Sequence, residues 1–160
     1  MEISDDKFEK IKKEAENFYG AIVKVKCPYL TGDVHFNTEG FQHLLFKDWN
    51  TTRTRFEQYT RLRLIKLAPE IIKISHTLQE YDERQLFVRQ KINSRWEKRL
   101  KTVRYYVFVA IIDFVRLKIV IKEIEGGVKF FYSLYPSWRV EKDSNGNNKK
   151  IFFSGNLEID

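Results

Sequence analysis

The chain has 160 residues, of which 42% are hydrophobic and 32% charged, and its formal net charge is +7. This composition excludes a disordered or membrane-spanning protein and predicts one domain, residues 1–160, with a core of its own. A single cysteine, Cys27, excludes an intrachain disulfide, and the acidic residues after Met1 do not match a secretory signal. We therefore expect a soluble, cytoplasmic protein that makes no membrane contact.

Helical spacing dominates the first half of the chain. Residues 5–19 place apolar side chains at helical intervals and stop at Gly20, a common helix end, and Asn37 or Thr38 can cap a second helix that runs to about Phe46. Between these helices we expect short extended segments. The predicted helices are residues 5–19, 37–46, 52–67 and 70–81, with a break at Pro69, and the predicted extended segments are residues 21–27 and 34–36. Residues 85–102 fit either a basic helix or a mobile loop.

Strands dominate the second half. Residues 103–112 and 115–125 are β-branched and aromatic, and Gly126-Gly127 is a two-residue hairpin signal before a third strand, residues 128–135. Residues 151–154 have the composition of a last strand. The predicted fold is α+β, with N-terminal helices followed by a three- to four-stranded antiparallel sheet that has a basic open face.

Positive charge is concentrated between Arg84 and Lys122, which contain eleven Lys or Arg and two acids. The rest of the chain is slightly acidic, so a polyanion is the expected partner of this region. Within it, residues 115–122 alternate between apolar side chains and cations, as in a strand with one apolar and one cationic face.

The glycine hairpin predicts a register. If Gly126-Gly127 is the loop, Lys122 pairs with Phe131 and Lys118 with Tyr135, and directly paired residues share a face. The basic face would then show Arg116, Lys118, Lys122, Phe131, Ser133, Tyr135 and Ser137. The opposite face would show Leu117, Ile119, Ile121, Phe130, Tyr132 and Leu134, against which helices pack.

The residue types suit RNA cleavage without a metal. That reaction needs a base for the 2′-hydroxyl, cations for the phosphate and an acid for the leaving oxygen. His35 precedes a predicted helix N-terminus, and His43 lies within that helix. The histidines do not have metal-ligand spacing, and there is no glycine-rich phosphate loop, so we expect no metal and no cofactor.

Two motifs carry a family resemblance. They are residues 34–47, VHFNTEGFQHLLFK, and the segment from Val103 through RLKIVI (116–121) to FFYSLYPSW (130–138). Together, over residues 33–138, they resemble small barnase-like nuclease domains of phages and mobile elements, in the superfamily that joins barnase, EndoU, colicin-type tRNases and RelE. The resemblance implies a metal-independent endoribonuclease, commonly a toxin that an antitoxin or immunity protein holds.

The resemblance also implies site residues. His35 or His43 would be general base or acid, Arg116 and Lys118 the phosphate clamp, Lys122 a second cation and Ser133 a hydrogen-bond donor. The candidate contacts to the RNA, either tRNA or mRNA, are Lys47, Arg95, Arg99, Arg104, Phe131 and Tyr135. Two alternatives stay open: a non-catalytic nucleic-acid-binding module, for DNA or for RNA, that uses residues 84–104, and a protein-interaction domain of a mobile element.

Overall fold

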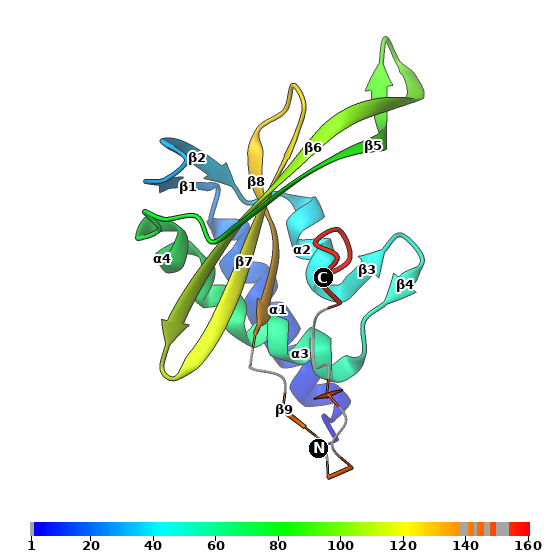
Figure 1. The fold of residues 1–160 in the computed structure, drawn as a ribbon. Coiled ribbons are helices and arrows are strands. Elements are labelled where there is room, and N and C mark those ends of the chain that lie inside the picture. Colours follow the sequence, from blue (N-terminus) through cyan, green and yellow to red (C-terminus); the bar gives the residue numbers. More distant parts are fainter. Residues whose placement is uncertain (1, 138–140, 143, 146–147, 150–153) are drawn as a thin grey trace.

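The computed structural model describes residues 2–137, 141–142, 144–145, 148–149 and 154–160 (Figure 1). Its helices are α1 (Asp5–Ala21), α2 (Thr38–Leu45), α3 (Arg55–Leu64) and α4 (Ala68–Lys73), with a 3-10 turn η1 (Ile65–Leu67) between the last two. None of the helices in these ranges is long and apolar enough to cross a membrane.

A six-stranded sheet in the order β1-β2-β8-β7-β6-β5 forms the centre of the molecule. Its strands are β1 (Lys24–Cys27), β2 (Gly32–His35), β5 (Glu80–Ile92), β6 (Arg95–Ile112), β7 (Val115–Ile124) and β8 (Lys129–Pro136). Two small pairs are separate from it: β3 (Phe46–Asp48) with β4 (Thr51–Thr52), and β9 (Glu141–Lys142) with β10 (Asn148–Lys149). All ladders of the large sheet are antiparallel except β2 with β8. The α+β class is confirmed, and the sheet is larger than predicted.

Helix ends follow local capping chemistry. Asn37 caps α2 by accepting a hydrogen bond from the Gly40 amide, as predicted, and Thr54 with Glu57 forms a reciprocal capping box on α3. Gly20 does not end α1, which continues to Ala21. The helix predicted over residues 70–81 is also wrong: it ends at Lys73, and β5 begins at Glu80, because this segment pairs with the long strand β6.

The sequence predicted either a helix or a loop for residues 85–102. In the structure they form most of a β-hairpin. Ile92 pairs with Arg95 across a two-residue turn in which Asn93 and Ser94 both have positive φ angles. Two consecutive positive φ angles are typical of the hairpin turn that matches the natural twist of the strands. Asp113 and Phe114 make the same turn between β6 and β7. Of the strand predicted over residues 151–154, residues 151–153 lie outside the described ranges, and Ser154 is not in a strand.

The predicted register holds for half of the β7–β8 hairpin. Lys118 pairs with Tyr135 and Val120 with Ser133, as expected, but beyond a β-bulge Lys122 pairs with Phe130 instead of Phe131. A bulge puts one extra residue into one strand and reverses the faces beyond it. The bulge therefore exchanges Phe131 with Phe130 and Tyr132 between the two faces.

Two apolar layers result. The helices cover the back face of the sheet, defined by Leu117, Ile119, Ile121, Phe131 and Leu134, and the main core lies there. The front face is defined by Lys118, Val120, Lys122, Phe130, Tyr132 and Tyr135. A second apolar cluster with Leu157 covers part of it. Leu157 belongs to residues 154–160, which we call the tail and which lie beside α2 in Figure 1. The expected basic open face is therefore not observed.

Candidate functional site

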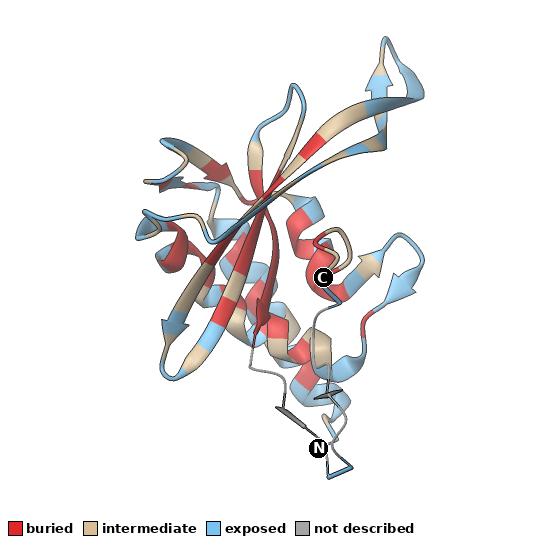
Figure 2. Cartoon of the chain, viewed as in Figure 1, coloured by how far each residue is buried: buried red, intermediate tan, exposed pale blue. Residues whose placement is uncertain are grey.

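The hairpin of β5 and β6 extends well beyond the rest of the sheet. Strand β6 pairs with β7 only from Val103 onward, so residues 86–101, which we call the arm, pair only with each other. In Figure 1 the arm projects away from the helices, and in Figure 2 its outer part is mostly exposed. With about 3.3 Å per strand residue, its seven residue pairs give a reach of roughly 23 Å.

The arm carries most of the net charge of the chain. It contains six cations, Arg89, Lys91, Arg95, Lys98, Arg99 and Lys101, and a single acid, Glu97. That balance is +5, against +7 for the whole chain. A cationic projection of this kind sets up a strong local positive potential that attracts polyanions.

The two faces of the arm differ. Cross-strand pairing puts Phe87, Arg89, Lys91, Trp96, Lys98 and Leu100 on one face, which we call the Phe87 face. All six side chains are exposed, Phe87 to 73% and Trp96 to 61%. The other face carries four half-buried residues of β5, Leu86, Val88, Gln90 and Ile92, and opposite them Arg95, Glu97, Arg99 and Lys101 of β6. On this face Glu97 pairs with Arg99 at 3.2 Å. Within the arm, the Phe87 face thus combines three cations with three large apolar groups and has no acid.

One contact orders the Phe87 face. The Arg89 guanidinium lies over the Trp96 ring, 4.9 Å from its centroid. An arginine stacked on an exposed indole still presents its N–H donors to a ligand, and the indole still presents its other side. This pair is suited to a partner that offers both phosphates and flat bases.

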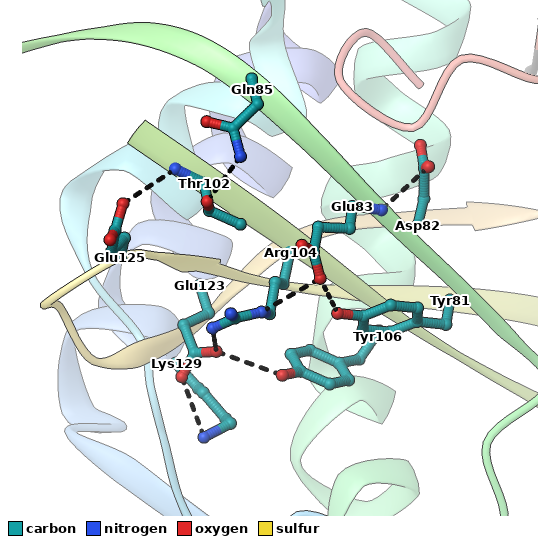
Figure 3. Close-up of polar contacts among 10 residues, drawn as sticks. All are labelled: Tyr81, Asp82, Glu83, Gln85, Thr102, Arg104, Tyr106, Glu123, Glu125 and Lys129. Atoms are coloured by element: carbon teal, nitrogen blue, oxygen red, sulfur yellow. Dashed lines mark hydrogen bonds and ion pairs between the residues drawn. The ribbon is translucent and has the colours of Figure 1, made fainter. Parts of the chain in front are cut away.

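The base of the arm is braced by polar contacts (Figure 3). Arg104 lies between Glu83 of β5 and Glu123 of β7, with N–O distances of 3.3 and 3.4 Å. The Tyr106 hydroxyl also bonds Glu123, and Gln85 bonds Thr102 across the hairpin. Arg104, predicted to contact RNA, is therefore engaged in holding three strands together.

The cations of the front face are paired with acids. Lys118 lies 2.5 Å from Glu80, and Lys122, only 5% exposed, lies 3.0 Å from Glu158 in the tail and 3.6 Å from Glu39 in α2. Burial lowers the pKa of Lys122, while Glu39 acts to keep it charged. The alternation of residues 115–122 was predicted correctly, but the expected cationic surface was not, because acids distant in sequence cover it.

Two predicted catalytic residues, His43 and Lys122, meet around Tyr132, and a third, Ser133, follows Tyr132 in β8. His43 stacks on the Tyr132 ring with centroids 4.0 Å apart, and the Lys122 ammonium lies 4.3 Å from the centroid of the same ring. Ser133 is the next residue along β8 and is fully buried. We call His43, Lys122, Tyr132 and Ser133 the Tyr132 cluster.

His43 is held neutral. It is 6% exposed, and its Nε2 lies 3.0 Å from Nη2 of Arg53. A guanidinium can only donate, so Nε2 is the acceptor and the ring proton sits on Nδ1. Burial first, and then the charges of Arg53, Arg61 and Lys122, lower the pKa of His43 to about 2. At neutral pH the imidazole is therefore uncharged, and it lacks the second ring proton that a general acid would give to a leaving group.

The carboxyl group of Glu158 has a pKa near neutral pH. Burial, reinforced by the negative charge of Glu39, raises its pKa to about 7. Its carboxylate also accepts a hydrogen bond from the Tyr105 hydroxyl and pairs with Lys122. Glu158 was not among the predicted site residues.

An open pocket of about 530 Å³ adjoins the cluster. Its lining includes Glu39, His43, Lys47, Trp49, Tyr132 and Glu158. Trp49, at the turn between β3 and β4, is 93% exposed. Lys47, a predicted RNA contact, therefore lies at the same pocket as His43.

The remaining predicted residues are dispersed. His35 ends β2 opposite Phe130, Arg116 is exposed near the turn between β6 and β7, and Arg95 and Arg99 lie on the arm. Phe131 was expected on the basic face. It is instead buried against Phe36 in the main core, and Tyr135 is buried beneath Arg61. Neither ring has surface to offer a base.

Sequence reasoning missed two buried arginines, Arg53 and Arg61. Arg53 donates to the main-chain oxygen of His43, and Arg61 to the hydroxyl of Ser133. Arg61 lies in α3 among Tyr59, Leu62 and Ile65, which face the core. A cation on the apolar side of an amphipathic helix was the available signal, because such a residue is rarely buried without a specific partner.

Comparison of the chain with protein-family models, with curated proteins and with solved structures gives no match. The functional argument therefore depends on the residues and the geometry alone.

The opposite pKa shifts of His43 and Glu158 predict an unusual pH profile. Below about pH 6.5 only the unfolded chain protonates His43. The free energy of unfolding therefore decreases as the pH is lowered, by up to about 1.4 kcal/mol per pH unit. Between about pH 7 and 4.5 only the folded chain protonates Glu158, so its contribution rises as pH falls.

The two effects oppose each other between about pH 4.5 and 6.5. We expect urea unfolding of the wild type to vary little in this window, and Glu158→Gln to lose stability steadily toward the acid end. Parallel profiles for the two proteins would contradict the assignment.

Proposed function

We propose that this chain binds duplex DNA through the Phe87 face of its arm. The observation that carries the proposal is the separation of side chains on the arm: three cations and three exposed apolar groups share one face, and the single acid lies on the other. This is the DNA-directed alternative that the basic stretch of the sequence left open.

The shape of the arm favours a duplex over a single strand. A two-stranded β-ribbon fits the major groove of B-form DNA, which is about 12 Å wide, whereas the major groove of an RNA helix is deep and too narrow for side chains to read. Single strands usually lie in a concave basic groove. The arm is instead a projection, with its donors and apolar groups on the outside.

The binding chemistry has two parts. Arg89, Lys91 and Lys98 would neutralise phosphates and release counterions, which gives affinity without sequence preference. Trp96, Phe87 and Leu100 would contact bases or sugars along the groove. No base preference is proposed.

A salt series tests the proposal directly. We expect fluorescence anisotropy with a labelled duplex of mixed sequence to show binding that weakens steeply as salt rises, with a log–log slope of about −3 or steeper. Equal affinity for a single strand of the same length, or no salt dependence, would contradict groove binding.

RNA cleavage without a metal is the second candidate, and the Tyr132 cluster is the observation that favours it. His43 and Lys122 were predicted as catalytic residues and contact the ring of Tyr132, and His43 and Tyr132 line an open pocket. Against it stand the neutral, buried His43 and the acids that pair with Lys122. The barnase-like resemblance, the antitoxin partner and the protein-interaction alternative stay predictions.

The second candidate has its own experiment. Incubation of the protein with tRNA and with an mRNA in EDTA is expected to give fragments with cyclic-phosphate ends, which His43→Ala abolishes. His76→Ala is the matched control, because His76 is exposed in the loop after α4. Intact RNA in every lane, with circular dichroism showing a folded protein, rejects the ribonuclease.

A further inference from the structure

The tail lies over a group of cations on the front face. Arg84 donates to the Asn156 side chain at 2.6 Å, and Lys122 pairs with Glu158 at 3.0 Å. Arg53 and Arg61 reach the end of the tail. The seven residues of the tail thus contact four cationic side chains. One comes from α3, one from the segment before α3, and two from strands of the large sheet.

Three donors converge on a single oxygen. The main-chain oxygen of Asp160 accepts hydrogen bonds from Nη1 of Arg61 at 2.6 Å, from Oγ of Ser133 at 2.8 Å and from Nη2 of Arg53 at 2.9 Å. Three donors that meet at one point, two of them charged, match the hydrogen-bonding capacity of an anionic oxygen. Carboxylate and phosphate oxygens are the groups that such donors bind best in proteins.

The three donors are fixed in place by the protein body. Ser133 lies in β8, and Arg61 is a fully buried residue of α3. Arg53 is held by its hydrogen bonds to the main-chain oxygen and the imidazole of His43. Burial lowers the pKa of Arg53 to about 10 and that of Arg61 to about 9. Two guanidiniums removed from water in this way need a strong acceptor.

The tail is a small folded unit of its own. The Asp160 carboxylate accepts from the amide and hydroxyl of Ser154 and from the amide of Gly155, at 2.7 to 2.9 Å. Its contacts to the body include the side-chain bonds above, the bonds of the Tyr105 and Tyr132 hydroxyls to Glu158, and the apolar contact of Leu157. The tail can therefore leave the front face without breaking its internal bonds.

We propose that the tail is a displaceable plug over an anion site formed by Arg53, Arg61 and Ser133, and that this site takes a phosphate group. The tail presents the main-chain oxygens of Ile159 and Asp160 to these donors, and a phosphate would present three oxygens from a single group. The inference does not depend on DNA binding by the arm, because none of the three donors belongs to the arm. It does not depend on RNA cleavage either, because it involves no catalytic step. Phosphate and tail compete, so the docked tail reduces the apparent affinity by the fraction of molecules in which it is open.

A thiol at position 157 reports whether the tail is docked. Leu157 is buried between the tail and the front face, and the native Cys27 is buried in the body. In the full chain carrying Leu157→Cys, an aromatic disulfide reagent should label the new thiol several-fold faster with pyrophosphate than with sodium chloride of equal ionic strength. An unchanged labelling rate would overturn the proposal.

The arm variant Arg89→Ser, Lys91→Ser, Lys98→Ser separates this result from binding at the arm. Introduced together with Leu157→Cys, it should leave the pyrophosphate effect intact. If the effect disappears, the anion binds the arm and the plug is rejected. A nucleoside monophosphate as second probe distinguishes a nucleotide site, where it acts more strongly than pyrophosphate, from a site for phosphate alone.

Direct binding gives an independent check. In the full chain, Leu157→Asp should release the tail and raise the affinity for pyrophosphate at least about tenfold in titration calorimetry. Ser133→Ala in that background should weaken it again. A folded Leu157→Asp variant that binds no more tightly than the wild type would overturn the proposal, and if this variant does not fold, the labelling experiment decides alone.

Discussion

Replacement of Arg89, Lys91 and Lys98 by serine is expected to weaken binding of duplex DNA by about 100-fold at low salt. Each of these cations on the Phe87 face should neutralise one phosphate, so the log–log salt slope should become shallower by about 2.7. Anisotropy titrations of wild type and variant over a series of salt concentrations measure both quantities.

The matched control removes the same charge from the opposite face. Arg95→Ser, Arg99→Ser, Lys101→Ser also deletes three cations of the arm, but these alternate with Glu97, which pairs with Arg99. We expect a clearly smaller loss and little change of slope. Equal losses in the two variants would indicate attraction by net charge without a defined face, and no loss in either would reject the arm as the binding site.

Gly40→Ala is expected to destabilise the protein by about 3 kcal/mol or more. A Cβ atom at Gly40 would lie 2.1 Å from the main-chain oxygen of Phe131 and 2.6 Å from the Tyr19 hydroxyl. The first is part of β8, and the second is fixed by a hydrogen bond to the Asn37 oxygen at 2.6 Å. Neither can move without separating α2 from the sheet. Urea unfolding monitored by circular dichroism gives the free energy.

Gly20→Ala is the control for helix propensity. Gly20 also lies in a helix, but a Cβ atom there would have no neighbour within 4 Å. We expect a gain of about 0.5 to 1 kcal/mol, because alanine restricts the unfolded chain and favours the helix. If both alanines act alike, the close approach of α2 to β8 is not as tight as described.

Local pattern was sufficient for much of the fold. The alternation of residues 115–122 predicts a strand because period two is a property of the chain itself, and Asn37 predicts a helix start because its side chain bonds an amide three residues away. These signals involve neighbours in sequence. They remain valid whatever the rest of the protein does.

The errors arise where a distant partner decides. The helical spacing of apolar residues after Pro69 was overridden by β6, which recruits the chain from Glu80 onward into a strand. The bulge in β8 could not be read from the hairpin loop, although it decides which phenylalanine reaches the core. In residues 85–102 the alternation was interrupted by cations on both faces, so composition left helix and loop open, and the turn residues Asn93 and Ser94 were the overlooked signal.

The candidate site was predicted in part for the same reason. The resemblance placed His43 and Lys122 among the site residues, and both contact the Tyr132 ring. It also implied an open cationic face, which the structure does not have, because Glu39, Glu80 and Glu158 reach it from other elements. No pattern in the sequence indicates that Glu158 forms an ion pair with Lys122.

The parallel pairing of β2 with β8 has a consequence for how the chain folds during synthesis. His35 pairs with Phe130, and Val34 beside it is completely buried, so the N-terminal third cannot complete its core until β8 has left the ribosome. Pairings between such distant segments form slowly and leave apolar surface exposed in the meantime. We therefore expect the nascent chain to depend on chaperones until β8 has left the ribosome, and the large sheet to form only then.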